Sequence, residues 1–296
     1  MTAPRQILAG ATYLVTRRCS QRQFLLRPSE TVNAIFLYVL ALAARRFGIR
    51  VHAFCVLSNH FHAVVTDPDA RLPAFEQYLD SLVARATNAF LGRWEDFWAP
   101  NSYSAVKLES AADIISKCAY TLANPVAAGL VSSSRDWPGL WTSPEQIGSV
   151  PIVARKPNVF FRKKGYLPEA VELELTVPAG WPVEEFRERL SREVAQLEQS
   201  ARRALAAIGR AFLGPKRVLA QKPSARPAPG EPRRNLNPRI AARDQWKRRE
   251  ALSRLVGFLR AYRAARKAFV AGASDVLFPA GTYLLRVVQG VRCAAA

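Results

Sequence analysis

The sequence predicts an α+β fold in which helices pack on one face of an antiparallel sheet, followed by a basic, mainly helical C-terminal extension. Three observations indicate this fold: a strand pattern over residues 11–16, apolar residues at helical spacing over residues 29–47, and a strand pair over about residues 50–66. A second helix follows over residues 72–90. The order of strand, helix, strands and helix is typical of α+β proteins.

Each element rests on its own pattern. The helix predicted over residues 29–47 carries an apolar stripe made of Val32, Ile35, Phe36, Val39, Leu40, Ala43 and Phe47. The later part of the strand pair includes the octet 58–65, which holds two of the three histidines of the chain. A loop rich in tryptophan is expected over residues 94–103, before a further helix.

His60 and His62 stand two residues apart in an apolar run. Successive side chains of a strand alternate between its faces, so both imidazoles are expected on one side and Phe61 on the other. Two imidazoles on one side form half of a metal site. The alternative is a partly exposed strand whose histidines only make hydrogen bonds.

A second signal is the segment 120–131. The helix that carries it is expected to begin after Ser110, since Asp113 follows three residues later in the spacing of a capping box, and to end before Pro125. Tyr120 and Asn124 lie four positions apart, which places them together on one side of the helix and away from an apolar stripe formed by Ile114, Ile115, Cys118 and Leu122. The tyrosine is therefore expected to be presented to solvent. The alternatives are a packing role for Tyr120 and a helix-stop role for Asn124 before proline.

Together the two segments resemble the single-tyrosine HUH transposases, and especially the REP-associated tyrosine transposases. His60-Phe61-His62 matches the His-hydrophobic-His motif. The nucleophile motif Tyr-x-x-x-Asn-Pro-Val-x-x-Gly is matched by Tyr120, Asn124, Pro125, Val126 and Gly129. Similar residues also occur at 13–17, 53–57 and 136–138, so the resemblance covers about residues 5–145.

This resemblance implies a ferredoxin-like or RRM-like sheet and a metal-dependent endonuclease and strand transferase acting on single-stranded or hairpin DNA. Tyr120 would be the nucleophile that forms a phosphotyrosine bond with DNA. His60 and His62, with Asn124 as third ligand by analogy with the family, would bind Mg²⁺ or Mn²⁺. The base that accepts the phenol proton is not identified by the sequence.

Several residues are candidates for DNA contacts. Arg17 and Arg18 end the first strand and Lys107 lies further on, and each is expected to contact a phosphate unless it is an ordinary surface charge. Lys117 lies one helical turn before Tyr120, where it could lower the pKa of the phenol. Tyr103 is a candidate for stacking on an unpaired base.

The segment 97–103 departs from the family pattern. Related sequences commonly carry an arginine before an aromatic residue there, and this chain has none. We therefore expect differences in how the substrate is bound rather than in the chemistry. Trp98, in the same segment, is expected to pack in the core.

The composition limits the chemical class of the binding partner. The 296 residues carry a net charge of +20, which suggests a polyanion, either nucleic acid or an anionic membrane surface. Residues 1–150 hold 14 Lys+Arg and 11 Asp+Glu, so the remainder holds 43 − 14 = 29 and 23 − 11 = 12, which is +17. The basic excess therefore belongs to the second half.

The four cysteines predict neither a zinc site nor a disulfide framework, because they are scattered: Cys19, Cys55, Cys118 and Cys293. The N-terminus has no signal-peptide core, and the longest apolar stretch, residues 32–44, is too short to span a bilayer. We therefore expect a cytoplasmic, nucleoid-associated protein. A homodimer is left open.

Four regions are expected: a transposase-like domain over residues 1–145, an accessory strand and helix region over 146–213, a flexible linker rich in Pro and Arg over 214–238, and a basic helical region over 239–296. Within them, a strand is expected over 171–177 and helices over 183–212 and 240–271. The last helix either contacts DNA or is only a solvated face.

Two other function classes remain open. The first is a catalytically lapsed, domesticated nucleic-acid-binding protein in which the basic region is the working part. The second is a membrane-surface protein, which is less favoured because the basic segments lack a broad apolar face with exposed aromatic residues.

Overall fold

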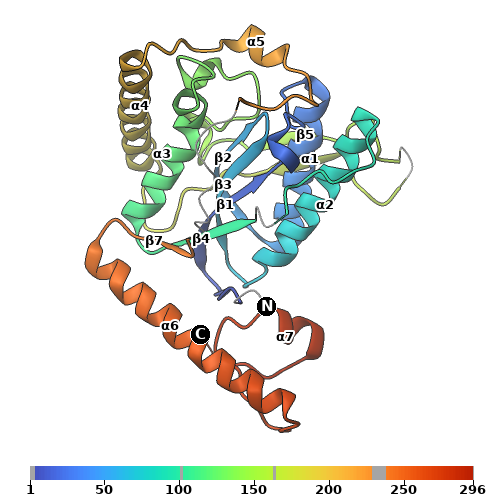
Figure 1. Ribbon diagram of the computed structural model, residues 1–296, viewed down its shortest axis with the longest axis vertical. Coiled ribbons are helices and arrows are strands. Elements are labelled where there is room, and N and C mark those ends of the chain that lie inside the picture. Colours follow the sequence, from blue (N-terminus) through green and yellow to red (C-terminus); the bar gives the residue numbers. More distant parts are fainter. Residues whose placement is uncertain (1–3, 101–102, 163–164, 229–237, 296) are drawn as a thin grey trace.

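A five-stranded sheet forms the centre of the protein in the computed structural model, which describes residues 4–100, 103–162, 165–228 and 238–295. The strand order is β2-β3-β1-β4-β7 (Figure 1), and the first four strands are antiparallel neighbours. The fifth is a short strand that pairs in parallel with β4. The strands are β1 (Ala11–Arg18), β2 (Arg50–Leu57), β3 (His60–Asp67), β4 (Ser104–Leu108) and β7 (Ile240–Ala241). The predicted α+β class is confirmed.

Helices cover both faces of this sheet, so the expectation of helices on one face is wrong. Helices α1 (Glu30–Phe47) and α2 (Leu72–Leu91) pack on one face, whereas α3 (Ala111–Ala127) packs on the other with α4 (Val183–Ala207) beside it. The reason lies in the strands: Tyr13 and Val15 are buried toward α1, and Leu14 between them is buried toward α3. A sheet that is apolar on both faces needs cover on both.

Helix termini follow the sequence signals in two of the main helices. The Ser29 side chain accepts a hydrogen bond from the Val32 amide at the start of α1, and Ser110 does the same for Asp113 at the start of α3. However, α3 does not end before Pro125. It continues to Ala127 with Pro125 in its last turn, where the proline costs the helix one amide hydrogen bond. The Ala128 amide, which donates to the Asn124 carbonyl, closes this turn.

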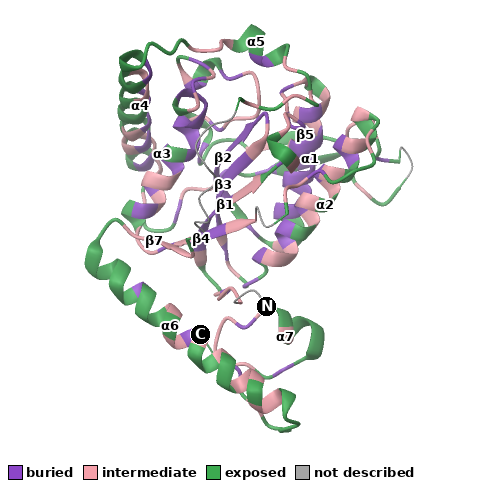
Figure 2. Ribbon diagram, viewed as in Figure 1, coloured by how far each residue is buried: buried purple, intermediate pink, exposed green. Residues whose placement is uncertain are grey.

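The second half of the chain packs on the first. A short hairpin of β5 (Ile152–Arg155) and β6 (Ala170–Leu173) lies against α1, and α4 ends five residues earlier than the helix expected to residue 212. The remaining helices are α5 (Pro215–Leu219), α6 (Gln245–Val270) and α7 (Leu284–Gln289), with single 3₁₀ turns η1 (Ser20–Arg22), η2 (Ser134–Asp136) and η3 (Pro144–Gln146). Figure 2 shows that burial concentrates in the sheet and in α1 and α3, while α6 is largely exposed.

The expected flexible linker is folded where the structure describes it. The Leu213 amide donates to the Gly129 carbonyl, Val218 is completely buried, and the Ser58 hydroxyl donates to Gln221 Oε1 at 2.9 Å. The sequence did not indicate these contacts, because the segment has few large apolar residues and most of the contacts are made by its backbone. Residues 229–237 of the expected linker lie outside the described residues.

Cys19, Cys55 and Cys118 are buried and free, and Cys293 is partly exposed and also free. Burial raises the pKa of the three buried thiols, which keeps them protonated and inert at neutral pH. Among the described residues, no helix is both long and apolar enough to cross a membrane.

Candidate nucleophile and metal site

His60 and His62 project from β3 on the face covered by α3. Their ring centroids lie 4.9 Å apart with 86° between the planes. Phe61 points to the other face, where its ring lies 5.1 Å from that of Phe36 in α1. The alternation of strand side chains therefore gives the geometry that the sequence predicts.

One nitrogen of each imidazole is held by a neighbour. His62 Nδ1 lies 2.7 Å from the Thr16 hydroxyl on β1, and His60 Nδ1 lies 2.7 Å from Asn59 Oδ1. Since the amide oxygen only accepts, His60 carries its proton on Nδ1. The Nε2 atom of neither ring makes a hydrogen bond to a described residue. His60 Nε2 therefore carries a lone pair, and His62 Nε2 carries one in the tautomer whose Nδ1–H donates to the Thr16 hydroxyl.

Both imidazoles are neutral at physiological pH. Burial, followed by the charges of Arg18 and Lys117, lowers the pKa of His62 to about 3. Burial, then His62, Arg18 and Arg22, lowers the pKa of His60 well below its ordinary value. A neutral imidazole offers a lone pair to a metal, whereas an imidazolium does not.

Tyr120 lies beside this pair. It projects from α3 with 42% of its surface exposed, and its ring centroid lies 5.3 Å from that of His62 at an angle of 72°. Its neighbours Ala119 and Thr121 are buried, so the helix holds the phenol at the surface. Lys117 Nζ lies 5.4 Å from the centre of the Tyr120 ring.

Asn124 follows Tyr120 by four residues, roughly 6 Å along the helix axis. It is more buried than expected, with 8% exposed, and its side chain makes no hydrogen bond to a described residue. In the described part of the chain, no group of three or more His, Cys, Asp or Glu side chains is placed to hold a metal. Among the described residues, a third protein ligand would therefore have to be of another type, and the sequence-based candidate is the Asn124 amide oxygen.

Two of the predicted DNA contacts lie near the site. The register of β1 on β3 pairs Arg18 with His60, and the charge of Arg18 acts on both histidines. Lys117 is the cation beside the Tyr120 ring. Arg22, which the sequence did not indicate, also acts on His60 from the η1 turn.

The other three predicted contacts lie elsewhere. Arg17 points to the opposite face of the sheet, where its Nε lies 3.3 Å from Asp80 Oδ2 on α2. Tyr103 is half-buried, and the Arg5 guanidinium lies 4.4 Å from its ring centre, so it covers one of the two ring faces on which a base could stack. Burial, then Glu76, raises the pKa of Tyr103 well above its ordinary value.

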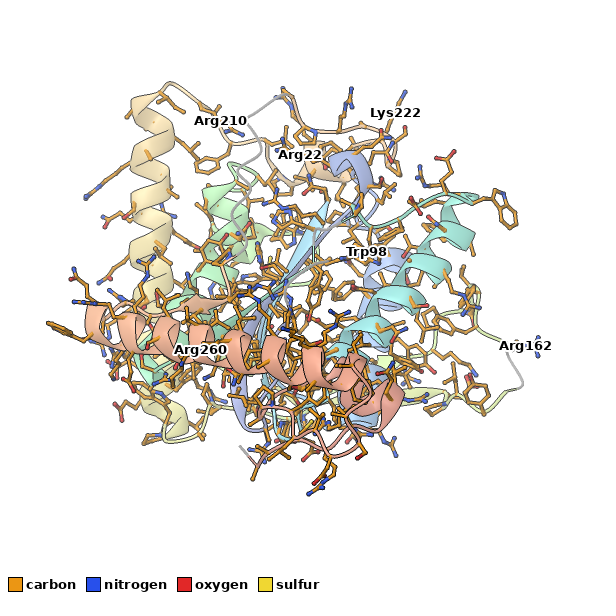
Figure 3. All side chains as sticks on the ribbon, turned by 60° about the horizontal axis from the view of Figure 1, so that its bottom comes forward. Arg22, Trp98, Arg162, Arg210, Lys222 and Arg260 are labelled. Carbon is orange, nitrogen blue, oxygen red and sulfur yellow. The ribbon has the colours of Figure 1, made fainter. Side chains whose placement is uncertain are left out.

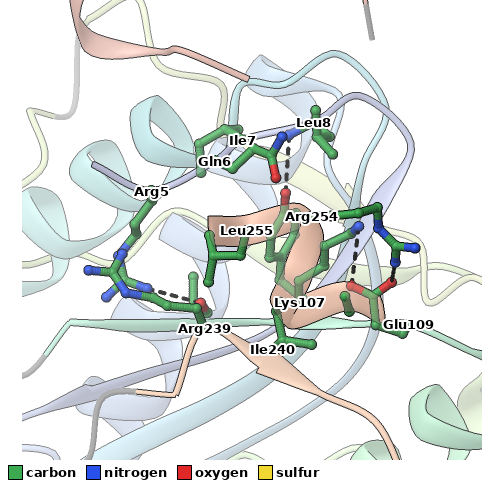
Figure 4. Close-up of a pocket in the computed structure, with 13 residues that line it drawn as sticks. Arg5, Gln6, Ile7, Leu8, Lys107, Glu109, Arg239, Ile240, Arg254 and Leu255 are labelled. Atoms are coloured by element: carbon green, nitrogen blue, oxygen red, sulfur yellow. Dashed lines mark hydrogen bonds and ion pairs between the residues drawn. The ribbon is translucent and has the colours of Figure 1, made fainter. Parts of the chain in front are cut away.

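Lys107 belongs to the junction between the sheet and α6. Its Nζ lies 3.3 Å from Glu109 Oε1, and Arg254 of α6 contacts the other oxygen of Glu109 at 2.8 Å (Figure 4). Since β4 pairs Lys107 with Tyr13 and Ser104 with Thr16, Lys107 lies three residues, or about 10 Å, along the strand from the position opposite His62. This ion-pair network fixes α6 to the sheet.

Sequence reasoning missed Thr16 and Asn59. Asn59 stands directly before His60, so the sequence could have indicated its polar side chain as a hydrogen-bond partner of that histidine. Thr16 gave none, because its position opposite His62 depends on the register of two strands that are distant in sequence.

No family model matches this sequence, and no curated protein matches it. Among solved structures, one similar chain is a REP-associated tyrosine transposase bound to a REP hairpin. It is 21% identical over 47% of this chain and 81% of that chain, with a TM-score of 0.41. Another is a candidate transposase from Deinococcus radiodurans R1, 20% identical over 36% of this chain and 85% of that one, with a TM-score of 0.29.

Proposed function

We propose that this protein is a metal-dependent, single-strand-specific DNA endonuclease and strand transferase of the single-tyrosine HUH type, acting on hairpin-forming DNA. The observation that carries the proposal is the meeting of an exposed tyrosine with two oriented, neutral imidazoles: His62 lies 5.3 Å from Tyr120 and 4.9 Å from His60, between ring centroids. This arrangement combines a nucleophile with two ligands of one metal.

In the proposed reaction, the Tyr120 oxygen attacks a DNA phosphorus. A bond forms between that oxygen and phosphorus, and the bond from phosphorus to the leaving deoxyribose oxygen breaks. The phenol gives up its proton to solvent water, which reaches Tyr120 because 42% of the residue is exposed, and the leaving oxygen takes a proton. The phosphotyrosine keeps the energy of the broken bond, so a second strand end can reverse the step without another energy source.

His60, His62 and Asn124 would hold Mg²⁺ or Mn²⁺, which when bound supplies Lewis-acid stabilisation of the attacked phosphate. Thr16 and Asn59 orient the imidazoles through Nδ1, which leaves Nε2 for the ion. Lys117 adds a positive charge next to the phenol, where negative charge develops as the proton leaves.

The test is the chemical identity of the product. Wild-type protein is incubated with a labelled hairpin oligonucleotide that has a single-stranded flank, in Mn²⁺ or Mg²⁺, and covalent protein–DNA adducts are digested with trypsin. We expect the nucleotide mass on the peptide that contains Tyr120. Binding without any adduct would instead support the non-catalytic nucleic-acid-binding alternative.

A further inference from the structure

A segment that resembled a linker in the sequence borders the turn that precedes His60. We name residues 213–226 the strap. At its start, the Leu213 and Gly214 amides donate to the carbonyls of Gly129 and Leu130, just after α3. Further on, Gln221 accepts a hydrogen bond from Ser58, two residues before His60. The strap thus joins the end of the tyrosine helix to the turn before the histidines.

The strap also packs against the segment 20–27, which follows β1. The Phe24 amide donates to the Ala225 carbonyl at 2.9 Å, Gln23 donates to the Ser224 carbonyl at 3.3 Å, and Arg27 donates to the Leu219 carbonyl at 2.5 Å. Asn59 ties this segment to the site, since its side chain contacts both His60 and the Arg22 carbonyl. The two segments therefore form one continuous surface beside His60.

That surface has no negative charge of its own. Residues 1–29 contain five arginines and no Asp or Glu, and residues 199–230 contain seven Lys or Arg and no Asp or Glu. The fold brings these two acid-free stretches together although about 200 residues separate them. Five of their cations are exposed and make no ion pair with any described residue: Arg22, Lys216, Arg217, Lys222 and Arg226. Figure 3 shows Arg22 and Lys222 at the same end of the molecule.

Such a group of like charges repels itself in the free protein and gains free energy when a polyanion lies across it. The strap reaches both the end of the tyrosine helix and the turn before His60, so a DNA strand whose phosphate meets Tyr120 can extend across it. We propose that the strap and residues 20–27 bind the phosphate backbone of the single strand next to the phosphate that Tyr120 attacks. This inference rests on the proposed function and names the part of the chain that holds its substrate.

The test is a double substitution in the full chain, Lys222→Ala with Arg226→Ala. Both side chains are exposed, so the fold should persist, as measured by an unchanged melting temperature. Affinity for a fluorescent single-stranded oligonucleotide, measured in EDTA over a range of salt, should fall roughly tenfold at low salt. The slope of log K against log salt should decrease by about 1.4, which is about 0.7 for each lost phosphate contact.

The matched control is Arg45→Ala with Arg155→Ala. It removes the same charge from exposed positions on α1 and β5. These elements lie on the side of the five-stranded sheet opposite to α3. Equal losses of affinity in the two double variants would mean that only net charge matters and would overturn the inference. Binding in EDTA needs no cleavage, so the two failures are distinguishable. A wild type that binds DNA through the strap but forms no adduct would refute the proposed chemistry and leave only the contact between the strap and the DNA backbone.

Discussion

Tyr120 and His62 come from elements that are far apart in sequence, yet their ring centroids lie 5.3 Å apart. The contact depends on two independent rules: the alternation of side chains along β3, and the position of Tyr120 on the side of α3 away from its apolar stripe. Each rule was readable from the sequence. The sequence did not indicate that α3 lies on the histidine face of the sheet. Only the structure shows this.

Thr16 is expected to control the metal affinity of His62. Substitution Thr16→Val keeps the shape and strand preference of the side chain but removes the hydroxyl that lies 2.7 Å from His62 Nδ1. Loss of such an orienting partner lowers metal affinity by roughly tenfold to hundredfold. Calorimetric titration with Mn²⁺ measures this change.

The matched control for Thr16 is Thr12→Val on the same strand. The Thr12 hydroxyl also makes a 2.7 Å hydrogen bond, to Thr66, which contacts His52 rather than His60 or His62. Both variants should lose about 1 kcal/mol of unfolding free energy. If both bind Mn²⁺ like wild type, Thr16 has no role in the site.

Asn124→Ala tests the third ligand. Alanine has a higher helix propensity than asparagine, so α3 should persist, as circular dichroism can verify. If the Asn124 oxygen binds the ion, the variant should bind Mn²⁺ roughly tenfold more weakly or worse and cleave DNA correspondingly more slowly. The idea fails if the affinity for Mn²⁺ and the cleavage rate both equal those of wild type.

His52 should make the stability of the protein depend on pH. Burial lowers its pKa to about 4, and its two nitrogens lie 2.7 Å from the Thr176 carbonyl and the Thr66 hydroxyl. Below pH 6.5, the ordinary pKa of histidine, His52 is protonated in the unfolded state but stays neutral in the folded state. Stability that is present above pH 6.5 is therefore lost as pH falls toward 4.

The comparison is His52→Gln, which cannot titrate. Between pH 6.5 and 4, the unfolding free energy of wild type should fall by about 3 kcal/mol relative to the variant. Urea denaturation at several pH values measures the difference. Parallel curves for the two proteins would show that His52 does not remain neutral in the fold.

Sequence patterns predicted individual helices and strands better than they predicted which elements pack together. The helix over residues 29–47 and the strands around the histidines were predicted closely, because their apolar periods are strong. β4 was missed, since five residues that include Lys107 carry little alternation. The strap was misread as a linker, because most of its contacts are backbone hydrogen bonds, which composition does not reveal.

The site shows the same division. Local motifs singled out Tyr120, His60 and His62, and the structure brings these three side chains together. Arg17 and Lys107 were predicted to contact DNA, but they form ion pairs with Asp80 and Glu109. The sequence position of an arginine or lysine does not indicate which carboxylate it will contact after folding. Only the register of distant strands and helices decides that.

Helix α6 is expected to add a second contact to DNA without taking part in the chemistry. Arg260, Arg263 and Lys267 are exposed and make no ion pair with a described residue. Replacing all three by Gln should lower the salt slope of single-strand binding by about 2, and adduct formation at saturating DNA should stay unchanged. An unchanged slope would indicate that α6 is only a solvated face.

The central claim is that the Tyr120 hydroxyl forms a covalent bond with DNA, and adduct formation by Tyr120→Phe measures it most directly. The control is Tyr166→Phe, which removes the hydroxyl of a tyrosine that is 93% exposed. With labelled hairpin DNA and Mn²⁺, wild type and the control should form the adduct. Tyr120→Phe should form none, while it binds the DNA with nearly wild-type affinity. A covalent adduct on Tyr120→Phe at the wild-type rate would contradict the account.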